Sequence, residues 1–426
     1  MPLRRFDAPG WRRELDLVRR LNLGGTDEQR ESVAAIVRAV ALRGDAALAE
    51  YSRRFDGWAP PPGDSWAVSQ AEMQLAAERL PADHLAALEF AAQRIRAFHA
   101  AQTYADVERP DGLQLLTRPV RRAGLYAPGG RAAYPSTVLM AGIPARVAGV
   151  QHVALATPPN AGGRVPDAIL AAAQLAGVDC VYRLGGAQAI AAFAYGTQTV
   201  QAVDVIAGPG NIYVALAKRE VFGVVGVDGV AGPTEILVIA DGQADATLVA
   251  ADLASQLEHD AAAWAVLLTD SAALADAVEE AFSELQVSLE RADVVAAANC
   301  AIVLTTSLEE AVELANEFAP EHLEILAADP EPLLARVENA GAVFVGSLSP
   351  VSLGDYVIGT NHTLPTAGSA RHSSPLGVYT FLKRTSVARL NRAQFIELEG
   401  AGRTLARVEG LTAHAHAIAA RTKGEE

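Results

Sequence analysis

From about residue 150 onward, short apolar runs of four or five residues alternate with amphipathic stretches of helical periodicity. Each run is followed within a few residues by a helix-like segment, which is typical of parallel βα units. The runs fall into two clusters, one before and one after Gly232-Pro233, so the pattern predicts an α/β fold with two α/β domains. The predicted strands are Val153–Ala156, Cys180–Leu184, Val203–Ile206, Ile236–Ile239, Trp264–Leu268, Ala301–Leu304 and Ala342–Val345.

The two ends of the chain have a different pattern. The first hundred residues are helical in character, and both Thr26–Gln29 and Ser69–Glu72 have the spacing of a capping box at a helix start. Pro60–Asp64 predicts a surface loop between them. The last fifty or so residues also have the pattern of helices, and we expect them to form a helical tail.

Composition narrows the class of protein. A chain of 426 residues, half of them hydrophobic, predicts two or three folded domains and argues against disorder. A net charge of −15 argues against nucleic acid and anionic membranes as partners. Cys180 and Cys300 lie far apart in apolar runs, so we expect a reducing compartment and no thiolate metal site. Neither a signal peptide nor a membrane span is evident, so we expect a soluble cytoplasmic protein.

The sequence contains two glycine-rich turns. Gly124–Gly130 and Gly208–Asn211 each come after an apolar run and before a helix-like stretch. Such turns let backbone N–H groups approach a phosphate group. Neither has the GxGxxG spacing of a dinucleotide-binding fingerprint, so plain turns without a ligand remain the alternative.

A possible metal-binding pair lies at Gln256 and His259. The segment Asp245–Asp260 predicts a helix capped by Asp245, and a spacing of three would place both side chains on one face. An amide oxygen and an imidazole nitrogen can ligate one metal ion, although a metal site needs three or four ligands. An ordinary surface or core histidine is the alternative.

A possible acid–base pair lies at Glu321 and His322. Both follow Pro320, which suits the first turn of a helix, and adjacent helical residues point in different directions. Each side chain could therefore serve a different proton. The alternative is a capping glutamate beside an ordinary histidine.

The segment Gly354–Thr366 concentrates polar chemistry in what we predict to be a loop. It carries Asp355, Tyr356, Asn361 and His362, and it is too rich in Gly and Pro for a regular helix or strand. Loops on a rigid scaffold often carry binding and catalytic residues. A turn-rich surface loop without function is the alternative.

In the tail, Glu409 precedes Gly410 and a predicted short helix with His414 and His416. On one straight helix Glu409 and His414 would point apart, but Gly410 interrupts the geometry and would let them converge. A solvated terminal helix is the alternative.

Taken together, these motifs resemble the histidinol dehydrogenase family. The resemblance runs through nearly the whole chain. Each motif alone is a weak sign of the family, but all of them in this order are specific for it. They are Gly124–Gly130, Gly208–Val214, Ala231–Glu235, Gln256–Asp260, Ala319–Glu324, Gly354–Thr366, Phe381–Arg384 and Leu411–His414.

The resemblance implies zinc- and NAD-dependent conversion of L-histidinol through L-histidinaldehyde to L-histidine, the last two steps of histidine biosynthesis. By motif, the implied zinc ligands are Gln256, His259, Asp355 and His414, and the implied acid–base pair is Glu321 and His322. The implied NAD contacts are Tyr126, Gln188 and Asn211. The implied substrate contacts are Thr234, His362 and Glu409, together with the ligands and the acid–base pair. Thr234 stands where the family usually has serine, which keeps the hydroxyl and adds a methyl group.

The resemblance also implies an architecture with incomplete Rossmann-like parallel sheets. The implied parts are an N-terminal helical segment (1–21), a larger α/β domain with the metal and acid–base residues (22–124 plus 234–376), a second, NAD-contacting α/β domain (125–233) and a dimer-forming helical tail (377–426). A homodimer with shared active sites is implied. Three alternatives remain open: a sister dehydrogenase for another polar alcohol such as a sulfonated diol, a zinc hydrolase that uses Glu321 as base, and a catalytically silent binding protein.

Overall fold

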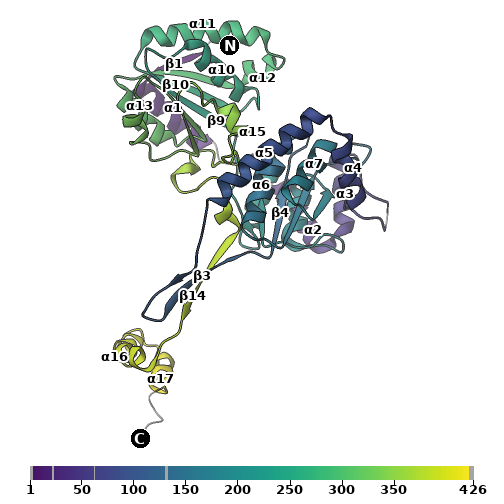
Figure 1. Ribbon diagram of the computed structural model, residues 1–426, viewed down its shortest axis with the longest axis vertical. Helices are drawn as coiled ribbons and strands as arrows, with labels where there is room; N and C mark the ends of the chain where they lie inside the picture. The colour runs from purple at the N-terminus through teal and green to yellow at the C-terminus, as the bar shows by residue number, and fades with distance from the viewer. Residues whose placement is uncertain (1–2, 22–23, 62, 130–132, 422–426) are drawn as a thin grey trace. The chain divides into compact units, whose positions relative to one another are not determined.

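The computed structural model describes residues 3–21, 24–61, 63–129 and 133–421 (Figure 1). Gly130, at the end of the first glycine-rich motif, lies outside the described residues. The chain forms two compact units. The first comprises Met1–Gln102 and Val120–Phe381, and the second comprises Thr103–Pro119 and Leu382–Glu426.

The first unit contains a six-stranded sheet in the order β1-β11-β10-β9-β12-β13, in which every pair is parallel. After β9 the chain adds β10 and β11 on one side, and then returns to place β12 on the other side. The direction of winding therefore changes between β9 and β12. The strands are β1 (Arg4–Asp7), β9 (Glu235–Ala240), β10 (Trp264–Thr269), β11 (Asn299–Leu304), β12 (His322–Leu326) and β13 (Ala342–Val345).

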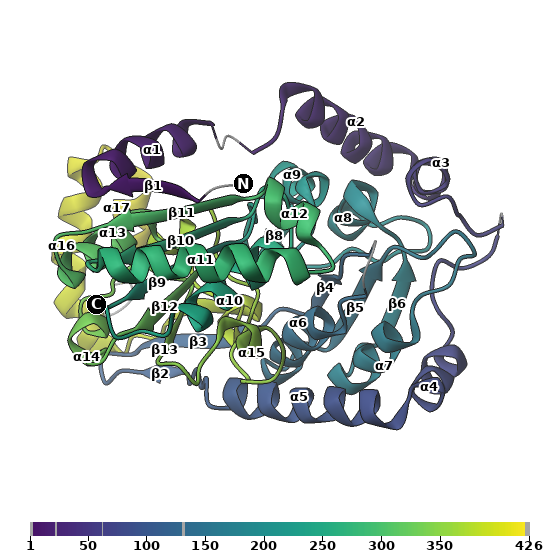
Figure 2. The same cartoon turned by 90° about the horizontal axis from the view of Figure 1, so that it is seen from above.

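Helices cover both faces of this sheet (Figure 2). Ile236 and Val238 of β9 pack with α10 and α11, whereas Leu237 and Ile239 pack on the opposite face with α1 and α13. A strand that is buried on both faces needs apolar residues at every position, which explains the continuous apolar runs in the sequence. The helices are α1 (Ala8–Leu21), α10 (Ala246–Leu257), α11 (Ala272–Ser288), α12 (Ala292–Ala297), α13 (Leu308–Phe318), α14 (Glu331–Leu334) and α15 (Val351–Tyr356).

The first unit also contains a five-stranded parallel sheet in the order β6-β5-β4-β7-β8. Its winding changes direction between β4 and β7. Gly208–Asn211 follows β7 as predicted, whereas Gly124–Tyr126 of the first motif form the end of β4 and only Ala127–Gly129 of its described residues follow the strand. In open α/β sheets, ligands bind outside the carboxyl ends of the strands at such a switch point. The strands are β4 (Arg122–Tyr126), β5 (His152–Thr157), β6 (Cys180–Arg183), β7 (Val205–Ala207) and β8 (Gly226–Val227).

Eight helices among the described residues surround this second sheet. Thr26 caps α2 with the predicted capping box, and the Ser69 hydroxyl accepts a hydrogen bond from the Glu72 N–H at the start of α4. The helices are α2 (Asp27–Arg43), α3 (Asp45–Phe55), α4 (Gln70–Arg79), α5 (Ala82–Ala100), α6 (Pro135–Val147), α7 (Asp167–Ala176), α8 (Gly186–Tyr195) and α9 (Ile212–Val221). The short 3₁₀ helices η1 (Ser369–Arg371) and η2 (Val378–Phe381) complete the first unit.

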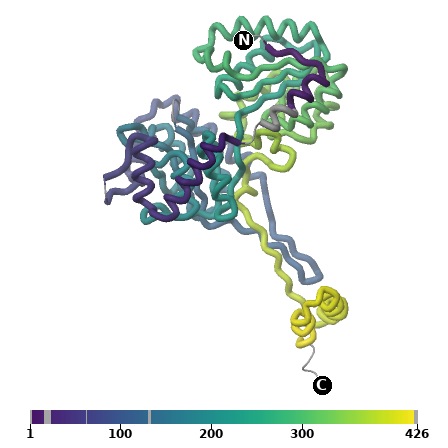
Figure 3. Tube along the Cα trace, turned by 180° about the vertical axis from the view of Figure 1, so that it is seen from behind, coloured from purple at the N-terminus to yellow at the C-terminus, as the bar shows by residue number. Residues whose placement is uncertain are grey.

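The second unit is an antiparallel sheet followed by two helices, drawn in blue and yellow in Figure 3. Its sheet has the order β14-β3-β2, and its two helices pack against each other. Several apolar side chains of the first helix, among them Ile396, Leu405 and Val408, are exposed within this unit. The elements are β2 (Val107–Glu108), β3 (Leu113–Pro119), β14 (Leu382–Ala388), α16 (Arg392–Val408) and α17 (Thr412–Ala419).

The predicted fold class is confirmed. All seven predicted strands lie in parallel sheets, and the two clusters form the two sheets. Residues 103–119, which we expected in the larger α/β domain, instead pair through β3 with β14 of the tail. The other expected domain boundaries stay predictions. No helix in the described part of the chain combines the length and the apolar character needed to cross a membrane.

Three local predictions around the candidate site are wrong in detail. Glu321 and His322 do not start a helix, because His322 opens β12, whose backbone pairs with both β9 and β13. Asp245 caps α10 as predicted, but the helix ends at Leu257, so His259 lies beyond it rather than on its face. The segment that begins at Gly354 is not all loop, since Gly354–Tyr356 forms the last turn of α15.

Candidate active site

A pocket of about 260 Å³ in the first unit brings many of the predicted site residues together. One wall comes from the carboxyl ends of β4 and β7, with Pro128, Pro209 and Gly210. The other wall comes from the amino ends of β9 and β12, the end of α10, and α15 with the segment that follows it. The residues of this second wall are Thr234, Gln256, His259, Glu321, His322, Asp355 and His362.

Glu321 lies immediately before β12 and is buried. Its Oε2 atom accepts hydrogen bonds from the Thr234 hydroxyl at 2.6 Å and from the Glu235 N–H at 2.9 Å. Burial raises the pKa of Glu321 to about 7, and these two hydrogen bonds oppose the rise. A carboxyl group with a pKa near neutrality can both accept and return a proton at working pH.

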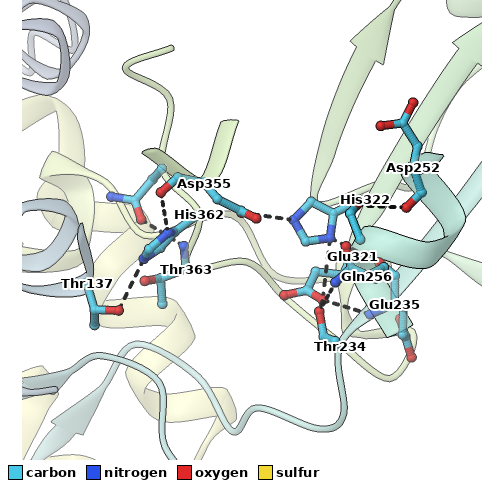
Figure 4. A network of polar contacts seen from close by, with 12 residues as sticks. Thr137, Thr234, Glu235, Asp252, Gln256, Glu321, His322, Asp355, His362 and Thr363 are labelled. Atoms are coloured by element: carbon cyan, nitrogen blue, oxygen red, sulfur yellow. Dashed lines mark hydrogen bonds and ion pairs between the residues drawn. The ribbon is translucent and has the colours of Figure 1, made fainter. Parts of the chain in front are cut away.

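His322 is buried beside Glu321 and is held in one orientation (Figure 4). Its Nδ1 atom lies 3.0 Å from the Glu235 carbonyl oxygen, which can only accept, so Nδ1 carries the proton and Nε2 is left as the acceptor. Nε2 lies 3.9 Å from Asp355 Oδ1. Burial lowers the pKa of His322, although the Asp355 charge opposes this effect. The imidazole is therefore neutral near pH 7 and presents a free base.

Thr234 links the acid to the end of α10. The Gln256 amide donates a hydrogen bond to the Thr234 hydroxyl, which in turn donates to Glu321. The amide nitrogen of Gln256 is thereby engaged, so its carbonyl oxygen is the atom that could ligate a metal ion. His259 follows one turn later and is exposed. Because the C-terminal end of a helix carries a partial negative charge, this end of α10 favours a cation.

His362 holds the backbone of Asp355. The His362 Nδ1–H donates to the Asp355 carbonyl oxygen at 2.9 Å, and Nε2 lies 3.4 Å from the Thr137 hydroxyl. Desolvation lowers the pKa of His362 to about 4, so this ring stays neutral. Burial raises the pKa of the Asp355 carboxyl to about 6, with the nearby Glu321 charge adding to the rise.

The donor atoms in this pocket suit a zinc ion, but one unit does not supply a full ligand set. Gln256, His259 and Asp355 offer nitrogen and oxygen ligands, which zinc accepts. Burial raises the pKa of the Asp355 carboxyl, and a bound cation would oppose this rise because it favours the charged form. Among the described residues, no group of three His, Cys, Asp or Glu side chains forms a metal site by itself. The fourth predicted ligand, His414, belongs to the second unit.

The predicted NAD contacts lie behind the glycine-rich turns and not among the residues that line the pocket. Tyr126 and Gln188 are buried; the Tyr126 hydroxyl accepts from the Gly186 N–H at 3.0 Å, and Gln188 donates to Asp56 at 3.2 Å. Asn211 is exposed, and its side chain caps α9 by accepting from the N–H groups of the first helical turn. Asn211 therefore fixes the end of the second glycine-rich turn, whereas Tyr126 and Gln188 are anchored to the start of α8 and to Asp56.

Glu409 and His414 are exposed side chains of the second unit. Glu409 ends α16, and Gly410 follows with a φ of 72° that separates α16 from α17 as predicted. His414 lies on α17 and lines an apolar hollow of that unit together with Phe395 and Ile418. Neither side chain is part of the pocket of the first unit.

Sequence reasoning missed three groups around the site. The Glu235 backbone anchors both members of the acid–base pair, and Thr137 contacts His362. Asp252 and Glu324 form a buried carboxyl pair. Asp252 lies one turn before Gln256 on α10, and Glu324 lies two residues after His322 on β12. The spacing of four on α10 and of two on β12 was a usable signal, because it places these acids on the same faces as the site residues.

The fold and pocket define an α/β protein with two parallel sheets and a buried acid–base pair beside nitrogen and oxygen ligands. Residues 22–422 match the family model described as histidinol dehydrogenase. The histidinol dehydrogenase of Rhizobium meliloti is 50% identical over 411 residues, which cover 94% of each chain. That of Dechloromonas aromatica is 49% identical over 392 residues, which cover 90% of each. The crystal structure of histidinol dehydrogenase from Elizabethkingia anophelis superposes with a TM-score of 0.92 at 34% identity, covering 99% of this chain and 98% of that one. The chain belongs to the histidinol dehydrogenase family.

Proposed function

We propose that this protein oxidises L-histidinol through L-histidinaldehyde to L-histidine, with NAD as the electron acceptor and one zinc ion per subunit. It would serve the final steps of histidine biosynthesis in the cytoplasm. One observation carries the proposal: Glu321 and His322 lie together in a pocket that also holds Gln256, His259 and Asp355. Hydrogen bonds fix both side chains, Glu321 through the Thr234 hydroxyl and His322 through the Glu235 carbonyl.

His322 is suited to the alcohol proton. Its Nδ1–H is engaged by the Glu235 carbonyl, so only Nε2 can accept a proton from substrate. The lowered pKa keeps this nitrogen free near pH 7. The fixed ring orientation removes the need to select a tautomer during turnover.

Glu321 is suited to the water that adds to the aldehyde. Its Oε2 is occupied by two donors, so Oε1 is the atom available to water. A pKa of about 7 lets this carboxyl accept a proton and return it within one turnover. Oxidation of the alcohol transfers one hydride to NAD and releases one proton. Oxidation of the hydrated aldehyde transfers a second hydride and releases two protons, because the acid that forms ionises to the carboxylate. His322 and Glu321 would accept protons in these two steps in turn.

Gln256, His259 and Asp355, joined by His414, would hold the zinc. When bound, the ion would act as a Lewis acid and hold the imidazole and amine of histidinol beside His322. The negative end of α10 supports a cation at this position. Thr234, His362 and Glu409 would complete the contacts to substrate.

NAD would bind at the switch point of the smaller sheet. Pro128 after β4 and Pro209 and Gly210 after β7 line the pocket, and Asn211 caps α9 at the end of the second turn. Tyr126, Gln188 and Asn211 would contact the NAD. We further propose a homodimer with shared sites, since Glu409 and His414 are exposed in the second unit and the first unit supplies only three of the four ligands.

The test measures NADH absorbance and histidine formation with purified protein. We expect two NAD reduced per histidine formed, because both oxidations use one site. A ratio of one with accumulating aldehyde would contradict the second half-reaction. Activity with a sulfonated diol but none with histidinol would favour the sister dehydrogenase, and a lack of any NAD reduction would exclude both.

A further inference from the structure

A buried ion pair lies directly behind one of the two glycine-rich turns. Lys218 of α9 and Asp228, just after β8, approach to 2.6 Å between Nζ and Oδ1, and their side chains are only 4% and 5% exposed. Neither residue belongs to the acid–base pair, to the predicted ligand set or to the predicted NAD contacts.

Both members of the pair bind the same residue, Gly208. Lys218 Nζ donates to the Gly208 carbonyl oxygen at 2.5 Å, and the Gly208 N–H donates to Asp228 Oδ2 at 2.7 Å. The Asp228 carboxylate also accepts from the Gly229 N–H at 2.8 Å. The ammonium and the carboxylate therefore hold the two peptide groups that flank the α-carbon of Gly208.

Gly208 occupies a backbone conformation and a packing position that suit glycine and few other residues. Its φ is +115°, a region that glycine adopts far more readily than other residues, and an added Cβ would lie 2.1 Å from the Tyr126 carbonyl oxygen. The turn after β7 thus touches the end of β4 at this glycine. The next two residues, Pro209 and Gly210, line the pocket, and Asn211 caps α9.

A buried ion pair adds little net stability compared with a well-packed apolar pair. Its specific effect here is geometric, since both charges bind a single glycine. We propose that Lys218 and Asp228 are positioning residues that fix the Gly208 peptides and so set the backbone of Pro209–Asn211 for the dinucleotide. This inference rests on the proposed function and extends it to two residues that are not among those lining the candidate active site.

The test replaces Lys218 with methionine, which matches the unbranched aliphatic part of the lysine side chain and removes the charged donor nitrogen. Isothermal titration calorimetry then measures the Kd for NAD and, separately, the Kd for histidinol. We expect the Kd for NAD to rise about ten-fold, because binding must then order a freed peptide. The Kd for histidinol should stay within about two-fold of wild type.

Arg146→Met is the matched control. It breaks the Arg146–Asp179 ion pair at the amino-terminal edge of the same sheet, 2.6 Å between its charged atoms, without touching either glycine-rich turn. The Kd for NAD should not change in this variant. If Lys218→Met does not fold, the double variant Lys218→Met with Asp228→Asn removes both charges together and is expected to show the same ten-fold rise.

The outcomes separate the inference from the proposed function. Wild-type protein that fails to bind NAD would contradict the proposed function itself. Wild-type protein that binds NAD, with unchanged affinity in the folded variants, would overturn the positioning role. Equal weakening of NAD and histidinol, or equal weakening by Arg146→Met, would show a general structural effect and would also overturn it.

Discussion

The buried carboxyl pair of Asp252 and Glu324 allows a sharp prediction about stability and pH. Glu324 of β12 is 1% exposed and Asp252 of α10 is 9% exposed. Burial raises the pKa of Glu324, and the charge of Asp252 and their mutual hydrogen bond raise it further. Burial also raises the pKa of Asp252. The folded pair therefore retains a proton that the unfolded chain releases above about pH 4.5.

The sign follows from proton counting. Above about pH 4.5 the folded state binds more protons than the unfolded state at this pair, so its contribution to the free energy of unfolding falls as pH rises. The slope for one retained proton is about 1.4 kcal/mol per pH unit until the folded pair ionises. Glu324→Gln keeps the shape of the side chain and removes the need to retain that proton.

The assay is urea unfolding at about pH 5.5, 6.5 and 7.5, followed by tryptophan fluorescence. Trp11 is fully buried and contacts Trp264 at 6.1 Å between ring centroids in the core of the same sheet, so their emission reports on this region. We expect the free energy of unfolding of Glu324→Gln, relative to wild type, to increase by about 1.4 kcal/mol for each pH unit.

Glu280→Gln on α11 is the control, because it makes the same chemical change at an exposed position. Its free energy of unfolding should run parallel to wild type at every pH. The other buried groups of the site titrate in both Glu324→Gln and wild type, so their contributions to the free energy of unfolding cancel in the difference. A pH-independent difference between Glu324→Gln and wild type would refute a retained proton at this pair.

Three further predictions concern the proposed active site. A strong chelator should abolish activity and Zn²⁺ or Mn²⁺ should restore it, and His259→Ala should lose bound metal by elemental analysis while it keeps its far-UV circular dichroism. His322→Asn should slow both oxidations by about 10²–10⁴-fold, whereas Glu321→Gln should slow the aldehyde step more than the alcohol step in single-turnover assays; equal damage to both steps would remove Glu321 as the water-activating base. Mixed His414→Ala and His322→Ala subunits should regain up to about half of wild-type activity per heterodimer, while His416→Ala should be active alone; inactive heterodimers of folded variants would mean that the tail serves its own subunit.

The strands could be predicted from the sequence because their burial leaves a local signature. The runs at Ile236–Ile239 and Trp264–Leu268 are apolar at every position, which only a strand covered on both faces requires. β12 was missed because it lacks this signature. His322 and Glu324 interrupt its apolar pattern: His322 lines the candidate site, and Glu324 belongs to the buried carboxyl pair.

The local structure of the candidate site was harder to predict than its residues. Pro320 before Glu321 favoured a helix start, yet pairing of His322 with Ile236 and Ala342 places it in a central strand. Long-range strand pairing outweighs such local preferences, since each paired residue gains backbone hydrogen bonds and buried area together. A helix cap such as Thr26 was predicted correctly because all of its partners lie within three residues.

The sequence by itself determined seven strands of the two parallel sheets, the turn after β7 and the chemical kinds of side chain available to a site. Only the tertiary structure decided that Glu321 meets Thr234, that His322 is oriented by the Glu235 carbonyl, and that Lys218 and Asp228 hold one glycine between them. These contacts depend on which strands lie side by side and in which register, and that order follows from packing across the whole sheet. Burial, which shifts the pKa of Glu321 to about 7, is likewise a property of the assembled fold and not of any segment alone.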